Sequence, residues 1–338
     1  MAAPIPQRRH RRPGFTLVEL LIVMGIIVLL MGVLLPAVMH AMKTGRKSRL
    51  QADMHTIDMA LEAYKSDFGD YPNFPSNISS PSGQWDLYSQ RGAELLCRAL
   101  IGPGPGVLKS RPSPDNSGED GAGDPNNPIL SGPGFRTRIG VDSTGAFVAQ
   151  GKVWGPYLSP DKFRVLSLST VPNVSTVFSS TQSTGSIDAT AVLLDSENHV
   201  ILYFPANTKS PTVNVANGFV INTQPTAGTP FSPIPLYNFY DNATVPSDPT
   251  GTMPFAPMSN TPSWFADFAA MLGADPSTGA VASGSSSSYT GPYLLWMAGD
   301  DGMYGLENKP NITGGTDFHG TGKSDDITNF DFPLNLRK

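Results

Sequence analysis

The sequence has one cysteine, few histidines and no recognisable catalytic motif. Cys97 has no second cysteine with which to form an intramolecular disulfide. If the chain is exported, its folded domain therefore needs another source of stability, such as a metal or a partner subunit. The 5 histidines form neither of the patterns HxxxH and HExxH that are typical of zinc sites, and no GxSxG motif is present. The sequence gives no support for catalysis, and we expect a protein that is not an enzyme.

Basic and charged residues are also scarce. The chain has 23 Lys and Arg against 28 Asp and Glu, a formal net charge of -5, so it has no overall electrostatic attraction to nucleic acid. Charged residues make up only 15% of the chain, whereas 34 glycines and 32 prolines indicate many turns and loops. The 338 residues suffice for one large domain or two small ones with a hydrophobic core.

One N-terminal stretch is apolar with a single exception. Leu17 to Leu35 contains only Glu19 as a charged residue, and about 20 helical residues cross the hydrocarbon layer of a bilayer. The basic cluster before this stretch is stronger than the one after it, which favours a cytoplasmic N-terminus and places the bulk of the chain on the other side. A secretory signal would have a shorter apolar core and a cleavage site after it. The pattern predicts a membrane helix that continues into a further helix.

The segment PGFTLVELLIVMGIIVLLMGVLLPAV resembles the class III signal of type IV pilins and of the pseudopilins of type II secretion. In such signals a basic leader ends in Gly, Phe follows, and Glu is the fifth residue of the mature chain in an apolar helix that contains Pro. The matching residues are Gly14, Phe15, Glu19 and Pro36. The resemblance implies that a prepilin peptidase cuts between Gly14 and Phe15 and methylates the new amino group.

A filament gives Glu19 a physical role. A charged side chain at membrane depth costs roughly 2.5 to 3.5 kcal/mol unless it finds a partner. In a filament, the Glu19 carboxylate of one subunit can pair with the α-ammonium of Phe15 in its neighbour, and a carboxylate left unpaired penalises a wrong register. The alternative is a tolerated polar residue near the interface, since Glu19 lies early in the span. Gly25 and Gly32 allow helices to approach closely, and Pro36 should bend or locally melt the helix.

Beyond Pro36 the helical pattern resumes. Apolar residues recur at spacings of four and three and form one stripe: Leu50, Met54, Ile57, Leu61, Tyr64 and Phe68. The helix should end near Gly69. A short second helix is expected at Glu94–Ile101, and the sequence DSEN should be a hairpin turn. Strands are expected at Arg164–Ser169, Ala191–Leu194 and His199–Phe204, and in the segment YLLWMAG.

Together these elements predict an α+β, pilin-like fold. A long N-terminal helix, first transmembrane and then amphipathic, would pack on a small antiparallel sheet with large loop insertions. The predicted regions are a basic leader (1–14), a transmembrane helix half (15–42), an amphipathic helix half (43–70) and a globular pilin-like domain (71–338) with insertions near 101–150 and 205–290.

The C-terminal stretch LLWMAGDDGMYGLENKPNITGGTDFHGTGKSDDITNF resembles the calcium loop of the major pseudopilin. There a strand leads to Gly-x-Asp-Gly, and a later Asp-Ile precedes an aromatic residue. The matching residues are Gly299, Asp301, Gly302, Asp326, Ile327 and Phe330. Since Ca²⁺ takes six to eight oxygen ligands, the resemblance implies a Ca²⁺ site with Asp301 and Asp326 as ligands and Asp300 and Asp325 in support. The alternative is a solvated acidic pair that closes a loop.

The resemblance implies a structural subunit of a periplasmic type II secretion pseudopilus, most like the major pseudopilin and active in protein transport. Its partners would be other copies of itself, the prepilin peptidase, the inner-membrane secretion platform and other pseudopilins. It would cross the inner membrane once, with a cytoplasmic N-terminus and a periplasmic globular domain. The alternatives are a type IV pilin or minor pseudopilin, and a membrane-anchored binding module in which Trp85, Trp154 and Trp264 could contact a polymer.

Overall fold

The computed structural model describes a long helix and a globular α+β body. The described residues are 17–73, 92–102, 120–121, 135–141, 143, 147–159, 161–167, 191–207, 220–221, 236–242, 262–275, 277–281, 289–299, 304 and 326–330. The chain forms two compact units, residues 1–46 and residues 47–338. Its long N-terminal helix and small, mostly antiparallel sheets confirm the predicted α+β class.

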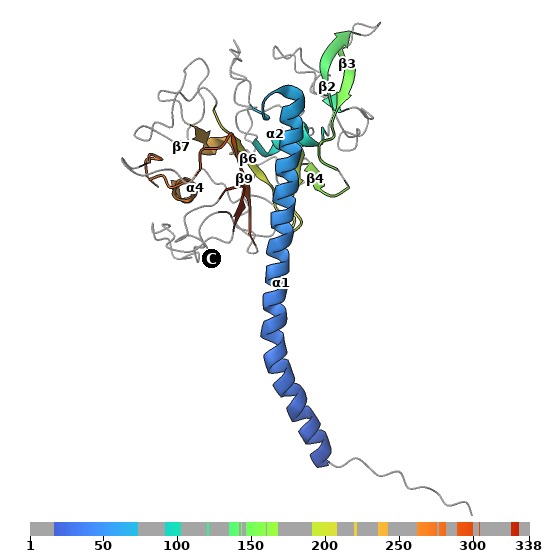
Figure 1. The fold of residues 1–338 in the computed structure, drawn as a ribbon, viewed down its shortest axis with the longest axis vertical. Helices are drawn as coiled ribbons and strands as arrows, with labels where there is room; N and C mark the ends of the chain where they lie inside the picture. The colour runs from blue at the N-terminus through green and yellow to red at the C-terminus, as the bar shows by residue number, and fades with distance from the viewer. Residues whose placement is uncertain are drawn as a thin grey trace, which may run out of the picture. The chain divides into compact units, whose positions relative to one another are not determined.

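Helix α1 runs from Leu17 to Phe68 as one continuous α-helix (Figure 1). It ends where the sequence predicts, because Gly69 adopts a φ of 84°, a left-handed conformation that glycine accepts without steric cost. The Gly69 N–H donates to the Lys65 carbonyl over 2.7 Å and closes the last turn. Pro36 lies inside α1 without interrupting it, so of the two expected effects, a bend or local melting, the melting does not occur.

The other elements of the described residues lie in the second unit. The helical ones are α2 (Gly92–Leu100), the 3-10 helix η5 (Phe239–Asn242) and α4 (Pro262–Met271). The longer strands are β2 (Phe135–Val141), β3 (Phe147–Trp154), β4 (Arg164–Ser167), β5 (Ala191–Leu194), β6 (Leu202–Pro205) and β9 (Tyr293–Met297). The described residues also include four two-residue strands: β1 (Asp120–Gly121), β7 (Val220–Ile221), β8 (Tyr237–Asn238) and β10 (Ile327–Thr328).

Within the described parts of the chain, these strands form four small sheets. The central one has the order β10-β9-β6 and is antiparallel, with Tyr203 opposite Leu295 and Ile327 opposite Met297. The hairpin β2-β3 extends to β1, and β4 pairs antiparallel with β5. Strands β7 and β8 form a parallel pair. The predicted strands at residues 164–169, 191–194, 199–204 and in YLLWMAG are therefore confirmed to within a few residues, as is the predicted second helix.

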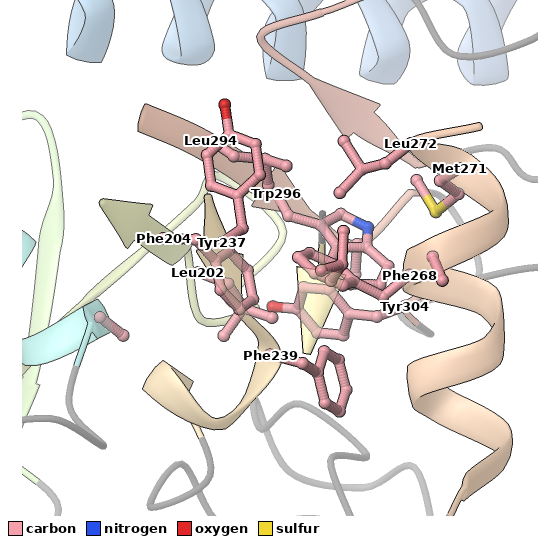
Figure 2. Close-up of a cluster of buried hydrophobic side chains, with 14 of the residues drawn as sticks. Leu202, Phe204, Tyr237, Phe239, Phe268, Met271, Leu272, Leu294, Trp296 and Tyr304 are labelled. Carbon is pink, nitrogen blue, oxygen red and sulfur yellow. The ribbon is translucent and has the colours of Figure 1, made fainter. Parts of the chain in front are cut away.

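Both faces of the central sheet are covered, and this arrangement explains why every residue of β6 and β9 is buried. Successive side chains of a strand point to opposite faces. One set packs against α1 and α2 in a cluster that includes Leu50, Ile57, Leu61, Leu96, Tyr203, Tyr293, Leu295 and Met297. The other set packs against α4 and η5 in the cluster of Figure 2, which includes Leu202, Phe204, Phe239, Phe268, Leu294, Trp296 and Tyr304.

The second cluster shows what the sequence does not reveal about residues 205–290. The sequence places this range among the loop insertions, whereas it supplies α4, η5 and β8 and such core residues as Tyr237, Phe239 and Phe268. Residues near 101–150 include β1, β2 and the start of β3. Much of both ranges lies outside the described residues.

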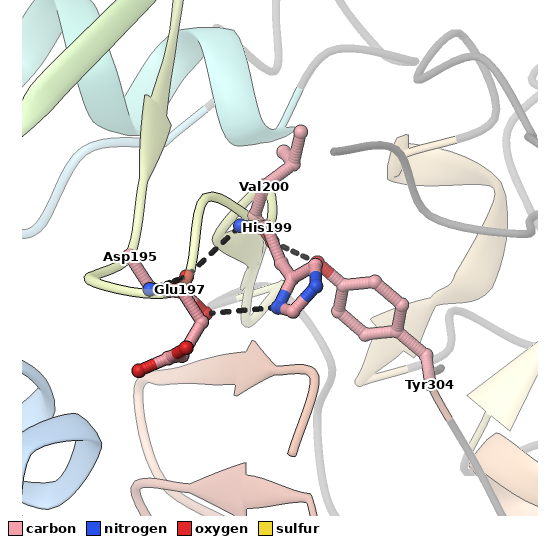
Figure 3. Close-up of polar contacts among 5 residues, drawn as sticks. All are labelled: Asp195, Glu197, His199, Val200 and Tyr304. Carbon is pink, nitrogen blue, oxygen red and sulfur yellow. Dashed lines mark hydrogen bonds and ion pairs between the residues drawn. The ribbon is translucent and has the colours of Figure 1, made fainter. Parts of the chain in front are cut away.

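The predicted turn between β5 and β6 is present, and one carboxylate holds it. Asp195 Oδ1 accepts hydrogen bonds from the backbone N–H groups of Glu197 and His199, both over 2.9 Å (Figure 3). Asn198 takes the positive φ of 74° that the turn requires. Beyond the bridge between Leu194 and Val200 the two strands separate, since β5 pairs with β4 and β6 pairs with β9. The hairpin therefore links two sheets.

Tyrosine hydroxyl groups attach the last turns of α1 to the body. Three carboxylates of α1 each accept a hydrogen bond from a tyrosine: Asp58 from Tyr293 (3.0 Å), Glu62 from Tyr71 (2.5 Å) and Asp67 from Tyr157 (2.6 Å). Partial burial raises the pKa of Asp58, and the hydrogen bond from Tyr293 opposes that rise. We call these three contacts the tyrosine clamps. They fix α1 at both edges of its buried apolar stripe.

The start of α2 is held against β6 by a buried amide. Asn242 accepts a hydrogen bond from the Ala93 N–H and donates one to the Tyr203 carbonyl, both over 2.8 Å. Gly92 lies so close to this contact that an added Cβ would come within 1.9 Å of the Tyr203 carbonyl oxygen. Only glycine fits at this position without a shift of the backbone.

Candidate functional site

The first candidate site is the N-terminal end of α1. Glu19 lies in the first turn of the helix and is exposed. Gly14 and Phe15, the predicted processing residues, lie outside the described residues. A carboxylate in the first turn is also favoured by the helix dipole, so the local structure tolerates Glu19 whatever its partner.

The surface of α1 around and beyond Glu19 is apolar on every side. Large side chains between Leu17 and Met42 are 43 to 78% exposed, with Ile27 at the low end and Leu17 at the high end. Within the described residues α1 is the one helix long and apolar enough to cross a membrane, and the most apolar window has a mean hydropathy of 2.9 with none of it buried. A helix with no polar face requires lipid or other apolar helices around it.

Two glycines, Gly25 and Gly32, interrupt this apolar surface. A Cβ added to Gly25 or Gly32 would meet no atom within 4 Å. Glycine costs roughly 0.5 to 1 kcal/mol relative to alanine within a helix, and small residues let apolar helices approach one another closely in a membrane. The two positions therefore suit contact with another helix.

The second candidate site is the predicted calcium loop, of whose four predicted ligands the structure describes one, Asp326. Asp326 is buried, with 5% of its surface exposed, and its Oδ2 accepts a hydrogen bond of 2.8 Å from the Trp296 indole N–H. Asp300, Asp301 and Asp325 lie outside the described residues. In the described part of the chain, no three His, Cys, Asp or Glu side chains come together as a metal site.

Negative charge nevertheless gathers near Asp326. Burial, followed by the charges of Asp195 and Asp326, raises the pKa of the Tyr304 hydroxyl well above its ordinary value. That hydroxyl donates to the Val200 carbonyl (Figure 3), and the Asp195 Oδ2 lies 3.7 Å from His199 Nδ1. The turn between β5 and β6 thus brings a second buried carboxylate to the region of Asp326.

Sequence patterns did not indicate the role of Asp195 in this region. The DSEN segment is recognisable as a turn. However, Asp195 and Asp326 are far apart in sequence, so no local pattern shows that both of them influence Tyr304. The tyrosine clamps were missed in the same way, because each one joins α1 to a separate part of the chain. Of the three tyrosines in these contacts, only Tyr71 is close in sequence to α1, because it follows the predicted helix end at Gly69 by two residues.

Comparison with protein families identifies the N-terminal region. Residues 9–35 match the prokaryotic N-terminal methylation motif, which covers the predicted processing residues Gly14 and Phe15, Glu19 and the apolar part of α1. This motif is typical of type IV pilin-like proteins and pseudopilins. No curated protein and no solved structure matches the chain. The long apolar helix α1, which begins within the matched residues, fits this motif.

Proposed function

We propose that this protein is a structural subunit of a type II secretion pseudopilus, most like the major pseudopilin, with a periplasmic body and an anchor in the inner membrane. The observation that carries the proposal is the combination of the methylation motif at residues 9–35 with an apolar helix exposed on all sides. The motif implies processing by a prepilin peptidase and polymerisation into a filament. The secretion platform and other pseudopilins would then be its partners in protein transport.

Assembly would move α1 from lipid into a bundle of identical helices. The apolar surface suits both surroundings, so the transfer costs little hydrophobic free energy, and close packing at Gly25 and Gly32 would favour the bundle. Glu19 would then set the register, because its carboxylate meets the α-ammonium of Phe15 of a neighbouring subunit at one axial offset.

Intact mass and N-terminal sequencing of the membrane-extracted protein test the proposed processing. We expect a mature chain that begins at a methylated Phe15. Gly14→Val should block the cut, because the peptidase acts at the Gly-Phe junction, and the full-length mass should then be recovered. A mutant with the mature wild-type mass would contradict the assignment. An uncut wild-type chain, or one cut beyond Met42, would favour a membrane-anchored binding module.

We further propose a Ca²⁺ ion held by Asp301 and Asp326, with Asp300 and Asp325 in support. The burial of Asp326 and the combined influence of Asp195 and Asp326 on Tyr304 support it, since a cation near clustered carboxylates offsets their repulsion and carboxylate oxygens are the ligands that Ca²⁺ prefers. The ion would hold the long connection between β9 and β10 in a protein that has no disulfide.

Calcium removal should lower the melting temperature of a fragment of residues 43–338. A ligand at 100 times its Kd stabilises the folded state by about 2.7 kcal/mol, and a chelator should remove that amount. Asp301→Ala, Asp326→Ala should make the melting temperature insensitive to chelator. Because Asp326→Ala also loses the Trp296 hydrogen bond, Asp301→Ala alone is the sharper variant. If it melts as high as the wild type in calcium, the site is wrong.

A further inference from the structure

A band of positive charge follows the apolar part of α1. Lys43, Arg46, Lys47 and Arg49 lie within seven residues of one another and are all exposed. Between Glu19 and Asp53 the sequence contains no Asp or Glu, so this stretch of α1 has a net positive charge. The chain as a whole has a formal charge of -5, and the band therefore stands out against its average.

The length of the apolar segment places the band relative to a bilayer. Leu17 to Met42 comprises 26 residues, or about 39 Å of helix at about 1.5 Å per residue. The hydrocarbon core of a bilayer is about 30 Å thick, and the polar headgroup regions extend this to about 40 to 45 Å. When the apolar segment spans the membrane, the side chains from Lys43 onward lie at the level of the headgroups.

The band also lies before the part of α1 that packs against the body. The first buried residue of α1 is Leu50, which is 1% exposed, so the cations do not serve that core. Arg49 is close enough to Asp53 to lower the pKa of that carboxyl group, although burial has the larger and opposite effect. Lys43, Arg46 and Lys47 are further from this carboxylate along the helix. These three side chains precede the buried part of α1 and lie nearest to the end of its apolar segment.

We propose that Lys43, Arg46 and Lys47 bind the phosphate groups of anionic phospholipids at the membrane surface where the apolar segment of α1 ends. Ammonium and guanidinium groups form charge-assisted hydrogen bonds with phosphate, and basic segments beside a membrane helix are attracted to anionic lipid over roughly one Debye length. We choose lipid over an acidic protein face because the apolar segment places the band at the headgroups of every inserted copy. The contact would fix the depth of α1, and it requires only insertion, independently of filament assembly.

Native mass spectrometry of the full-length protein tests this inference. The protein, in detergent with equal amounts of phosphatidylglycerol and phosphatidylcholine, should retain phosphatidylglycerol in about fivefold excess or more, the factor that corresponds to about 1 kcal/mol for one basic side chain at an anionic surface. K43Q/R46Q/K47Q should bring the ratio close to one, whereas the charge-preserving variant K43R/R46K/K47R should keep the excess. High salt should reduce the excess in the wild type.

Two outcomes would overturn the inference. Equal retention of the two lipids by the wild type would show that the band does not select anionic headgroups, and an acidic protein face would then be the better partner. An unchanged excess in the glutamine variant would place the lipid contact elsewhere. A wild-type melting temperature of the glutamine variant verifies that its body is folded. The state of the N-terminus, measured from the same spectra, reports separately on the proposed processing.

Discussion

Glu19→Ala should leave the protein inserted and cleaved but should abolish filament formation. In the assembled state the substitution leaves the α-ammonium of Phe15 among apolar helices without a counter-charge. Removal of one partner from a buried ion pair costs about 3 to 5 kcal/mol, which corresponds to at least about a 100-fold loss in the association constant. Filament yield, measured by shearing and electron microscopy, should fall to background while the mass of the mature chain in the membrane changes only by the substitution.

A neighbouring substitution separates charge from packing. Val18→Ala removes exposed apolar surface from the same turn of α1 and keeps the carboxylate, so it should reduce filament yield far less than Glu19→Ala. Normal filament yield from Glu19→Ala would remove the ion pair from the assembly mechanism. It would leave the apolar surface of α1 as the only driving force, and the acid would then be a tolerated polar residue near the membrane interface.

Gly92→Ala should destabilise the body by about 3 kcal/mol, near the upper end for an added methyl group in a tight core. The new Cβ would lie 1.9 Å from the Tyr203 carbonyl oxygen and 2.9 to 3.0 Å from the Asn242 amide atoms. Relief of the contact requires α2 to move away from β6 and weakens the two hydrogen bonds of Asn242. Urea unfolding of residues 43–338 should show a lower midpoint with an unchanged slope.

Gly45→Ala provides the matched control. The added Cβ at this position of α1 meets nothing within 4 Å, and alanine favours the helix by up to about 1 kcal/mol relative to glycine. The substitution should leave the midpoint of the body unchanged or raise it slightly. Equal midpoints for Gly92→Ala and the wild type would mean that α2 is not held tightly against β6.

The sequence predicts those parts of the fold whose signal is local. The apolar segment, the stripe from Leu50 to Leu61 and the Gly69 stop define α1 because each depends on residues a few positions apart. The strand YLLWM is recognisable as a continuous apolar run. The run is continuous because all five residues are buried, whichever face of the sheet they point to. The expected processing residues Gly14 and Phe15 and the expected assembly residue Glu19 also form one short local pattern, and all three lie within the matched motif at residues 9–35; their roles stay predictions.

The remaining features depend on contacts between distant parts of the chain. Phe239 and Phe268 belong to the core because they pack on the second face of the central sheet. No local pattern predicts this packing, because the surrounding region is rich in glycine, proline and serine. Asn242 stabilises α2 from 149 positions away. The likeness to a calcium loop points to Asp326 but not to Asp195, because the two residues are far apart in sequence, although both charges raise the pKa of Tyr304.

The tyrosine clamps have a mechanical consequence. Asp58, Glu62 and Asp67 are spread over more than two turns of α1, and each is bonded to a different segment of the body. A force applied along the axis of α1 loads all three bonds and the buried apolar stripe in shear, so they must rupture together. A pull across the axis would instead peel them apart one after another. The attachment of α1 to the body should therefore withstand a larger force along the helix axis than across it.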